Sequence, residues 1–305
     1  MKQFEATVVH TDRYFLGECA RYDEVRGELY WVNVAPDGGQ FFRAAADGPS
    51  VSILAHYDLP GSLTAVVPFA NRSEGWLVAC DDSILHLRED GSTTVVASPE
   101  AHNQGAVRTN DGAADPWGRF YIGSMARNAA TGRGSLYRFH ENTGVETILI
   151  GLTIANGIGW SPDERTMYYV DSGPGLLWAF DVTAEGTPEH QRVFASFDVP
   201  NEGTPDGLCV DVDGHVWVAL WGGYEVRRYA PDGTHVASVS VDTAQPSCCT
   251  IGGATGTTLY ITTAQEDMSE AQLVAEPNAG RLFAAEVGVR GLPINPYRPT
   301  LRGSL

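Results

Sequence analysis

A short pattern recurs six times along this chain of 305 residues: a turn rich in Gly, Asp or Pro, followed by a β-prone run with an aromatic residue near its start. Successive aromatic residues are separated by 46, 45, 47, 49 and 43 positions; they are Tyr30, Trp76, Tyr121, Tyr168, Trp217 and Tyr260. A nearly constant period of this length is typical of folds that repeat one small unit. The chain therefore reads as six related units.

Each copy is followed by a second β-prone run that ends at a turn glycine, as in Asp90-Gly91 and Asp232-Gly233. Asp-Gly is typical of hairpins, because glycine adopts a positive φ without steric cost. Helical periodicity is nearly absent, and residues 263–274 predict at most one or two helical turns. Four strands in about 47 residues, repeated six times, predict an all-β six-bladed propeller with four-stranded antiparallel blades, in a single domain over residues 1–305.

One strand-like segment, FEATVVH at residues 4–10, lies outside the six copies. Closure of the ring removes the open sheet edges that would otherwise pair with other chains. We expect this segment to pair with the C-terminal blade, around RLFAAEVGV at residues 281–289, and so to close the ring.

Polar residues recur at one phase upstream of the aromatic positions, where the innermost strand of each blade is expected. Five polar residues each lie 10 to 12 positions before one of the repeated aromatic residues: Glu18, Asn110, Asp111, Asn156 and Asp206. Equivalent positions on the inner strands of a closed ring converge near its axis. We therefore expect these side chains at one mouth of the central channel.

Several carboxylates at one mouth would repel one another and would be costly to desolvate unless a cation were bound. Carboxylate and amide oxygens suit hard divalent ions, so the sequence predicts one divalent metal ion: Ca²⁺ first, with Mg²⁺, Mn²⁺, Zn²⁺ or Fe²⁺ as alternatives. Only about three of these residues are expected to be ligands, which would leave a coordination position for water or substrate, as catalysis requires. An isolated Asn-Gly or Asp-Gly is more typical of a turn, and the prediction depends on several polar residues sharing one phase.

The charge balance is strongly acidic, with 20 Lys and Arg against 38 Asp and Glu and a formal net charge of −18. This excess argues against a nucleic-acid partner and against an anionic membrane surface. No apolar run approaches the length of a membrane span, and the first residues do not resemble a signal peptide, so a cytoplasmic protein is expected.

The five cysteines predict neither a disulfide framework nor a zinc site, because their number is odd and no C-x-x-C spacing occurs. The adjacent Cys248 and Cys249 are interpreted as small apolar residues of a core strand, with a strained vicinal disulfide as the alternative.

Four motifs in order resemble the senescence marker protein/gluconolactonase/regucalcin family. They are Gly17-Glu18 before ELYWVNV, residues 108–112 (RTNDG) before DPWGRFYIGSM, Ala155-Asn156-Gly157 before WSPDERTMYYVDS, and Pro205-Asp206-Gly207 before DGHVWVAL. PSCCTIGG (246–253) and GRLFAAEVGVRG (280–291) are similar to the family's last blade. The resemblance covers nearly the whole chain and implies a six-bladed propeller with one catalytic divalent metal, in a family with many sugar lactonases.

The resemblance also implies roles for single residues. The metal-ligand positions correspond to Glu18, Asn156 and Asp206, and Asp206 is also the general acid/base position; the substrate-contact positions correspond to Arg108 and Asn110. Where some members carry a carboxylate that contacts sugar hydroxyls, this chain has Arg127. We therefore expect Arg127 to face a more anionic or otherwise different lactone.

The function hypothesis is thus metal-dependent hydrolysis of a small-molecule sugar lactone to its aldonic acid. Three alternatives share the same propeller: a hydrolase of organophosphates or other esters, a non-catalytic module that binds calcium or a sugar acid, and a protein-interaction propeller. Fold alone does not separate them, because one scaffold hosts many functions.

Overall fold

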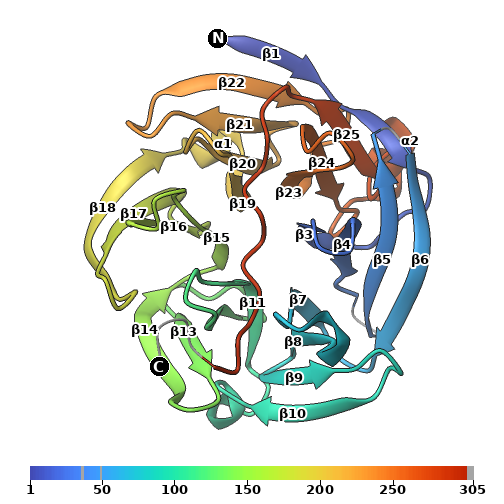
Figure 1. Cartoon of the computed structure of the whole chain (residues 1–305). Coiled ribbons are helices and arrows are strands. Elements are labelled where there is room, and N and C mark those ends of the chain that lie inside the picture. Colours follow the sequence, from blue (N-terminus) through green and yellow to red (C-terminus); the bar gives the residue numbers. More distant parts are fainter. Residues whose placement is uncertain (36–37, 49, 301–305) are drawn as a thin grey trace.

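A computed structural model describes residues 1–35, 38–48 and 50–300, which form six β-sheets arranged as blades around a central channel (Figure 1). The innermost strands of the blades contact one another in succession, and the last of them contacts the first. The predicted six-bladed propeller is confirmed. The innermost strands also match the segments that the sequence placed upstream of the repeat aromatics.

Within each blade, consecutive strands pair antiparallel from the channel outwards. The first three blades consist of β3 (Gly17–Asp23), β4 (Glu28–Asn33), β5 (Gly39–Asp47) and β6 (Ser50–Leu59); β7 (Leu63–Pro68), β8 (Trp76–Cys80), β9 (Ser83–Leu87) and β10 (Thr93–Ala97); and β11 (Val107–Ala114), β12 (Phe120–Ala126), β13 (Gly134–His140) and β14 (Gly144–Leu152). The other three consist of β15 (Ala155–Trp160), β16 (Thr166–Asp171), β17 (Leu176–Val182) and β18 (Pro188–Ser196); β19 (Thr204–Val210), β20 (Val216–Trp221), β21 (Glu225–Tyr229) and β22 (His235–Ser240); and β23 (Pro246–Gly252), β24 (Thr258–Thr263) and β25 (Leu282–Glu286).

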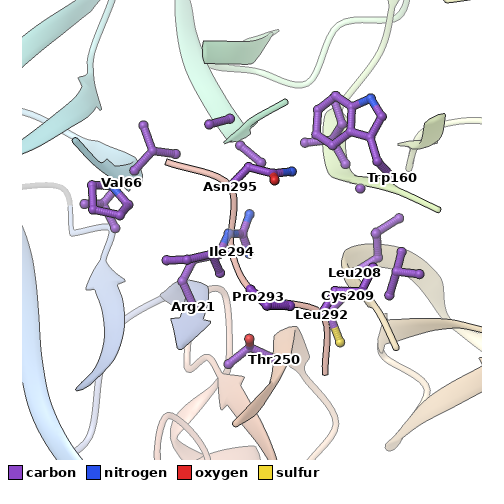
Figure 2. Close-up of a pocket in the computed structure, with 17 residues that line it drawn as sticks. Arg21, Val66, Trp160, Leu208, Cys209, Thr250, Leu292, Pro293, Ile294 and Asn295 are labelled. Carbon is purple, nitrogen blue, oxygen red and sulfur yellow. The ribbon is translucent and has the colours of Figure 1, made fainter. Parts of the chain in front are cut away.

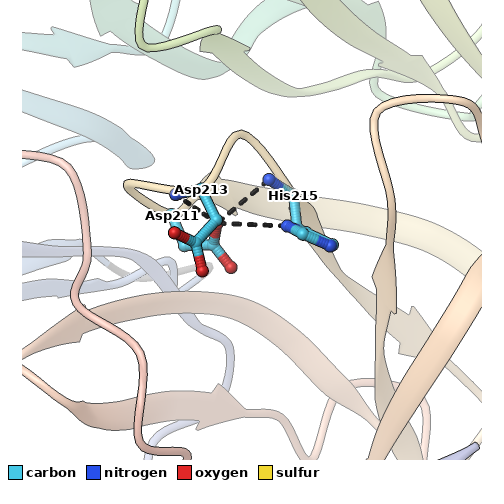
Figure 3. A group of neighbouring side chains, drawn as sticks. All are labelled: Asp211, Asp213 and His215. Carbon is cyan, nitrogen blue, oxygen red and sulfur yellow. Dashed lines mark hydrogen bonds and ion pairs between the residues drawn. The ribbon is translucent and has the colours of Figure 1, made fainter.

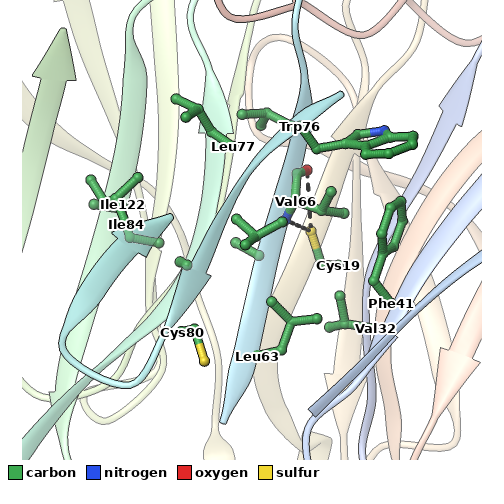
Figure 4. Packing of buried hydrophobic residues seen from close by; sticks show 14 of the residues in the cluster. Cys19, Val32, Phe41, Leu63, Val66, Trp76, Leu77, Cys80, Ile84 and Ile122 are labelled. Carbon is green, nitrogen blue, oxygen red and sulfur yellow. Dashed lines mark hydrogen bonds between the residues drawn. The ribbon is translucent and has the colours of Figure 1, made fainter. Parts of the chain in front are cut away.

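The repeat aromatics form part of the core between blades. All six lie on the second strand of a blade and are at most 3% exposed. Figure 4 shows one such cluster, in which Trp76 packs with Phe41 and Val66. In this cluster the Cys19 Sγ accepts a hydrogen bond from the Val66 amide at 3.3 Å, which ties the innermost strands of the first two blades together.

The N-terminus closes the ring, with one difference from the prediction. Strand β2 (Thr7–His10) pairs antiparallel with β25 and completes the last blade, as expected. Strand β1 (Lys2–Glu5), however, pairs parallel with β22 of the preceding blade and gives that blade a fifth strand. Ala6 lies between the two strands, is 6% exposed and donates its amide to Ser240, so the chain changes blades at this residue.

The C-terminal segment, residues 291–298, crosses one mouth of the channel, opposite to the mouth where the predicted polar residues lie (Figure 1). Its amides bond to blades on opposite sides of the ring, from Leu292 to the Val210 carbonyl of β19 (3.2 Å) and from Tyr297 to the Pro68 carbonyl of β7 (2.9 Å). Figure 2 shows this segment passing a small pocket of about 100 Å³ that Val66 and Trp160 also line. The two mouths therefore differ: the segment crosses this one, and the predicted polar residues lie at the other.

Helices are short and lie between strands. They are η1 (Arg72–Glu74), η2 (Ala101–Asn103), α1 (Val199–Glu202) and α2 (Glu270–Ala275). The α2 helix, capped by Ser269 and Gln272, matches the one or two turns expected within residues 263–274. In the described part of the chain, no helix has the length and apolar character needed to cross a membrane.

The cysteines of the described residues are all free, and Cys248 and Cys249 are both fully buried in β23. The interpretation of this pair as core-strand residues is confirmed.

Candidate metal and substrate site

The innermost strands share one irregularity, which aims side chains at the channel axis. In all six blades the register between the innermost strand and its neighbour shifts; the interruptions lie between Glu18 and Arg21, Leu63 and Ala65, Thr109 and Gly112, Ala155 and Ile158, Pro205 and Leu208, and Pro246 and Cys248. Such bulges leave residues unpaired and re-aim their side chains. Asn110, Asp111, Asn156 and Asp206 all lie inside an interruption, and Glu18 borders one.

These re-aimed side chains line one cavity of about 550 Å³ at the mouth of the channel. Every residue that the sequence singled out for a role lines it: Glu18, Arg108, Asn110, Arg127, Asn156 and Asp206. Asp111 lines it too. The repeat phase therefore predicted correctly which positions converge.

The amide of Asn156 is held in one orientation. Its Nδ2 donates to the Ser172 Oγ at 2.7 Å, and the Ser172 hydroxyl donates to the Pro205 carbonyl at 2.6 Å. Because the nitrogen is committed to Ser172, the Oδ1 of Asn156 remains as an acceptor, and the Asn110 Nδ2 reaches it at 2.8 Å. An amide fixed in this way presents a carbonyl oxygen, which is the atom a hard cation requires.

Two carboxylates of the cavity each have a buried oxygen to which the described residues offer no hydrogen bond. Among the described residues, no hydrogen bond reaches the buried Oδ1 of Asp206 or the buried Oδ2 of Asp111. Burial, and then the neighbouring Asp111 carboxylate, raises the pKa of Glu18 to about 8. Burial, and then the Glu18 carboxylate, raises the pKa of Asp206 well above its usual range. Orphaned carboxylate oxygens beside an oriented amide oxygen are a donor set that fits a divalent cation.

Arg108 and Asn110 form a polar wall beside these groups. The Arg108 Nη1 donates to the Thr109 carbonyl at 2.9 Å and to the Oδ1 of Asn110. A hydrogen-bonded path thus runs from Arg108 through Asn110 and Asn156 to Ser172. Movement of any one of these groups would shift the others.

Arg127 lies at the rim of the cavity, with its side chain 42% exposed. Its Nη2 pairs with the Asp81 Oδ1 at 2.5 Å, and its Nε donates to the Gly105 carbonyl at 3.0 Å. The predicted location is therefore observed, but Asp81 already balances the positive charge.

Two further residues line the cavity that the sequence pattern did not predict. Ser172 and Glu266 lie outside the innermost strands, so the repeat phase carried no signal for either. Glu266 follows a segment joined to the start of the first blade by an isolated bridge between Leu16 and Ala264. This bridge brings Glu266 to the wall that Glu18 also lines.

A second cluster, Asp211, Asp213 and His215, could in principle hold a metal (Figure 3). The Asp211 carboxylate is, however, saturated by protein donors. Its Oδ1 accepts the amides of Asp213 and His215, both at 3.0 Å. Its Oδ2 accepts the Trp217 Nε1 at 2.9 Å and the Arg228 Nη2 at 2.7 Å.

The same arrangement recurs in other blades. Asp23 accepts the Tyr30 hydroxyl at 3.0 Å and pairs with Arg72, and Asp115 accepts the Arg119 amide at 2.8 Å and pairs with Arg119. Each carboxylate holds the turn that leads to the second strand. We therefore interpret Asp211, Asp213 and His215 as a structural corner of the blade.

Replacing Asp211 by Ala is expected to destabilise the fold by about 3 kcal/mol, because it leaves the Arg228 guanidinium without its buried partner. His215→Ala should change the free energy of unfolding by less than about 1 kcal/mol, since its ring makes no hydrogen bond to the carboxylate. Urea denaturation measures both. A second divalent ion bound by the unmodified protein and lost in His215→Ala would contradict the structural interpretation.

The family model described as SMP-30/Gluconolactonase/LRE-like region matches residues 16–265. The chain belongs to this family. The sequence resemblance is confirmed, and the matched range contains the six residues singled out from the sequence for a role, from Glu18 to Asp206.

Named relatives span nearly the full chain. An L-arabinolactonase from Azospirillum brasilense is 34% identical over 304 residues, covering 98% of this chain and 97% of the relative. A 6-deoxy-6-sulfogluconolactonase from Pseudomonas putida is 30% identical, covering 90% of this chain and 92% of the relative. Among solved structures, a calcium-binding protein, regucalcin, from Agrobacterium tumefaciens superposes with a TM-score of 0.87 at 28% identity, covering 98% of this chain and 99% of that chain.

Proposed function

We propose that this protein is a divalent-metal-dependent hydrolase that converts a sugar lactone to its aldonic acid. The family and its relatives named as lactonases support lactone hydrolysis. The observation that carries the metal-dependent form of the proposal is the orphaned Asp206 Oδ1, which shares one cavity with Glu18 and the oriented amide of Asn156.

Glu18, Asn156 and Asp206 are the proposed metal ligands. Their donors are oxygens only, which favours Ca²⁺ over softer ions, and a regucalcin of similar structure is described as a calcium-binding protein. When bound, the ion supplies Lewis-acid polarisation of the lactone carbonyl. Three protein ligands leave room for that carbonyl oxygen, and Ser172 keeps the Asn156 oxygen turned toward the cavity.

Asp206 is the proposed general acid/base. With one oxygen of its carboxylate as a metal ligand, the other oxygen would take a proton from the attacking water and later give it to the ring oxygen that leaves. The proton added to the ring oxygen is then the one removed from water, so the ring opens with no net change in the protonation of Asp206.

Arg108 and Asn110 are proposed to orient the lactone through its oxygens, since a guanidinium presents donors in a fixed fork. Arg127 is proposed as a further substrate contact at the rim. Because Asp81 pairs with it, the rim offers both a donor and an acceptor, which suits sugar hydroxyls as well as an anionic substituent. Trp221 and Met125 line the same cavity and supply apolar surface for the face of the ring.

The test is hydrolysis of a panel of γ- and δ-lactones of pentonic and hexonic acids, followed by pH-stat titration. We expect turnover above the spontaneous rate for at least one sugar lactone, its loss after chelation, and its return when Ca²⁺, Mg²⁺, Mn²⁺, Zn²⁺ or Fe²⁺ is added singly. A phosphotriester assayed alongside separates the organophosphate alternative. Tight binding of Ca²⁺ with no turnover of any lactone would instead support a non-catalytic calcium-binding propeller.

A further inference from the structure

Arg21 is a buried arginine that the proposed chemistry does not use. It lies in β3, three residues after Glu18, and is 7% exposed. Its Nη2 contacts the Asp111 Oδ1 and the Gly112 carbonyl of β11, at 3.3 and 3.2 Å. Its Nη1 donates to the Ala20 carbonyl at 2.8 Å and lies 3.7 Å from the Cys248 Sγ of β23. One side chain thus links inner strands of three blades.

The Arg21–Asp111 pair lies between the two ends of the channel. Asp111 lines the cavity of the candidate site, whereas Arg21 lines the small pocket at the opposite mouth (Figure 2). Only one oxygen of Asp111 faces the guanidinium; its Oδ2 is buried and, among the described residues, has no hydrogen-bond partner. The pair therefore forms a charged floor beneath the proposed metal site.

The Arg21–Asp111 pair contributes to the net charge around the proposed metal site. Glu18, Asp111 and Asp206 line one cavity, and the Asp111 carboxylate raises the pKa of each of the other two. If all three are ionised, they carry three negative charges, and Arg21 carries one positive charge against them. The remaining balance of two negative charges equals the charge of one divalent ion.

Other charged groups of the cavity leave this balance in place. Arg108 and Glu266 line it with opposite charges, and Arg127 is paired with Asp81. Asp267 is exposed to solvent, which screens its charge.

We propose that Arg21 is the fixed counter-charge of the metal site: it cancels Asp111 and so sets the preference of the cavity for a divalent over a trivalent cation. The inference rests on the proposed metal site and adds a residue that determines its selectivity. Arg21 acts through Asp111 and is therefore a positioning residue. Its guanidinium suits this role because it remains charged when buried.

The test compares the affinities of Ca²⁺ and Tb³⁺ in the full-length protein by calorimetry. Trp221 in the cavity provides a second readout through sensitised terbium emission. The variants are Arg21→Met, Arg21→Lys, Asp111→Asn and the double variant Arg21→Met with Asp111→Asn. The quantity of interest is the ratio of Tb³⁺ to Ca²⁺ affinity, because it cancels losses that affect both ions equally.

Removing one unit of charge within several ångströms of the ion should change this ratio by about tenfold or more. We expect the ratio to rise in Arg21→Met and to fall in Asp111→Asn. The double variant has the same balance as the unmodified protein, so its ratio should return to within about threefold of the starting value. Arg21→Lys keeps the charge and should also stay within about threefold.

A purely structural role for Arg21 would not make the two single variants move in opposite directions. If Arg21→Met does not fold, Asp111→Asn and the double variant still decide, since the inference requires a lowered ratio in the first and a restored one in the second. An unmodified protein that binds both ions, with variants whose ratios do not move, overturns the inference alone. An unmodified protein that binds neither ion removes the proposed metal site and the inference with it.

Discussion

Asp206→Asn is expected to lower kcat for lactone hydrolysis by about 10³-fold, because general acid/base catalysis contributes 10² to 10⁴ in typical enzymes. The amide keeps an oxygen that can still coordinate a cation, but it cannot accept the proton of the attacking water. The measurement is pH-stat hydrolysis at a metal concentration that saturates the variant. Calorimetry on the same sample establishes that the metal is bound.

Two variants of neighbouring carboxylates separate the proton-transfer role from a ligand role. Glu18→Gln replaces a charged proposed ligand by a neutral amide oxygen and touches no proton-transfer group, so its loss of activity should be largely recovered as the metal concentration rises. Asp267→Asn alters an exposed carboxylate that lines the same cavity, and its kcat should stay within about threefold of the unmodified value. More than a tenth of normal kcat in metal-saturated Asp206→Asn would contradict the acid/base assignment.

The ring and the location of the site were predictable from sequence because both follow from a repeat. The spacing of the aromatic residues fixes the number of blades, and the phase within a unit fixes which positions face the channel. The dipeptides Asp90-Gly91 and Asp206-Gly207 have the same composition but different phases. Gly91 has a φ of 82° in a turn, whereas Gly207 has no positive φ and lies in the innermost strand β19.

Contacts between different blades were not predictable in the same way. The pairs Arg21–Asp111 and Arg127–Asp81 join residues far apart in the chain, and no local pattern encodes them. The pairing of β1 was not predictable for the same reason. Its four residues could form a strand against either neighbouring blade, and the buried position of Ala6 determines where the chain crosses. Ser172 was not predicted because its role is to orient the side-chain amide of Asn156, which only the folded structure shows.

Glycine follows two of the proposed ligands, Asn156 and Asp206, and the repeat alone does not explain why glycine is needed there. A Cβ at Gly207 would lie 2.5 Å from the Sγ, 2.6 Å from the Cβ and 2.7 Å from the Cα of Cys248 in the adjacent inner strand. A Cβ at Gly157 would lie 2.6 Å from the Asp206 carbonyl oxygen. Glycine is required at both positions because β19 passes close to β23 at Gly207 and close to β15 at Gly157. The second approach brings Asn156 and Asp206 to one cavity.

Gly207→Ala is accordingly expected to destabilise the protein by about 3 kcal/mol or more, at the upper end of the cost of overpacking, because backbone atoms of Cys248 cannot move aside. For a chain of this size, that loss corresponds to a fall in Tm of about 5 °C or more. Thermal unfolding followed by circular dichroism measures it. Adding Cys248→Ala removes only the Sγ, so we expect it to leave most of the loss in place.

Gly159→Ala is the matched control, since it lies in an innermost strand and also lacks a positive φ. Its added Cβ would meet only the ends of the Leu208 and Val210 side chains, at 2.9 and 3.2 Å, and these can rotate away. Its Tm should therefore fall by no more than about 3 °C. Equal losses in the two variants would mean that any added methyl group disturbs the inner ring. A Gly207→Ala protein as stable as the unmodified one would mean that β19 and β23 can separate without loss, and their close approach would then not be what fixes the strand of Asp206 in the inner ring.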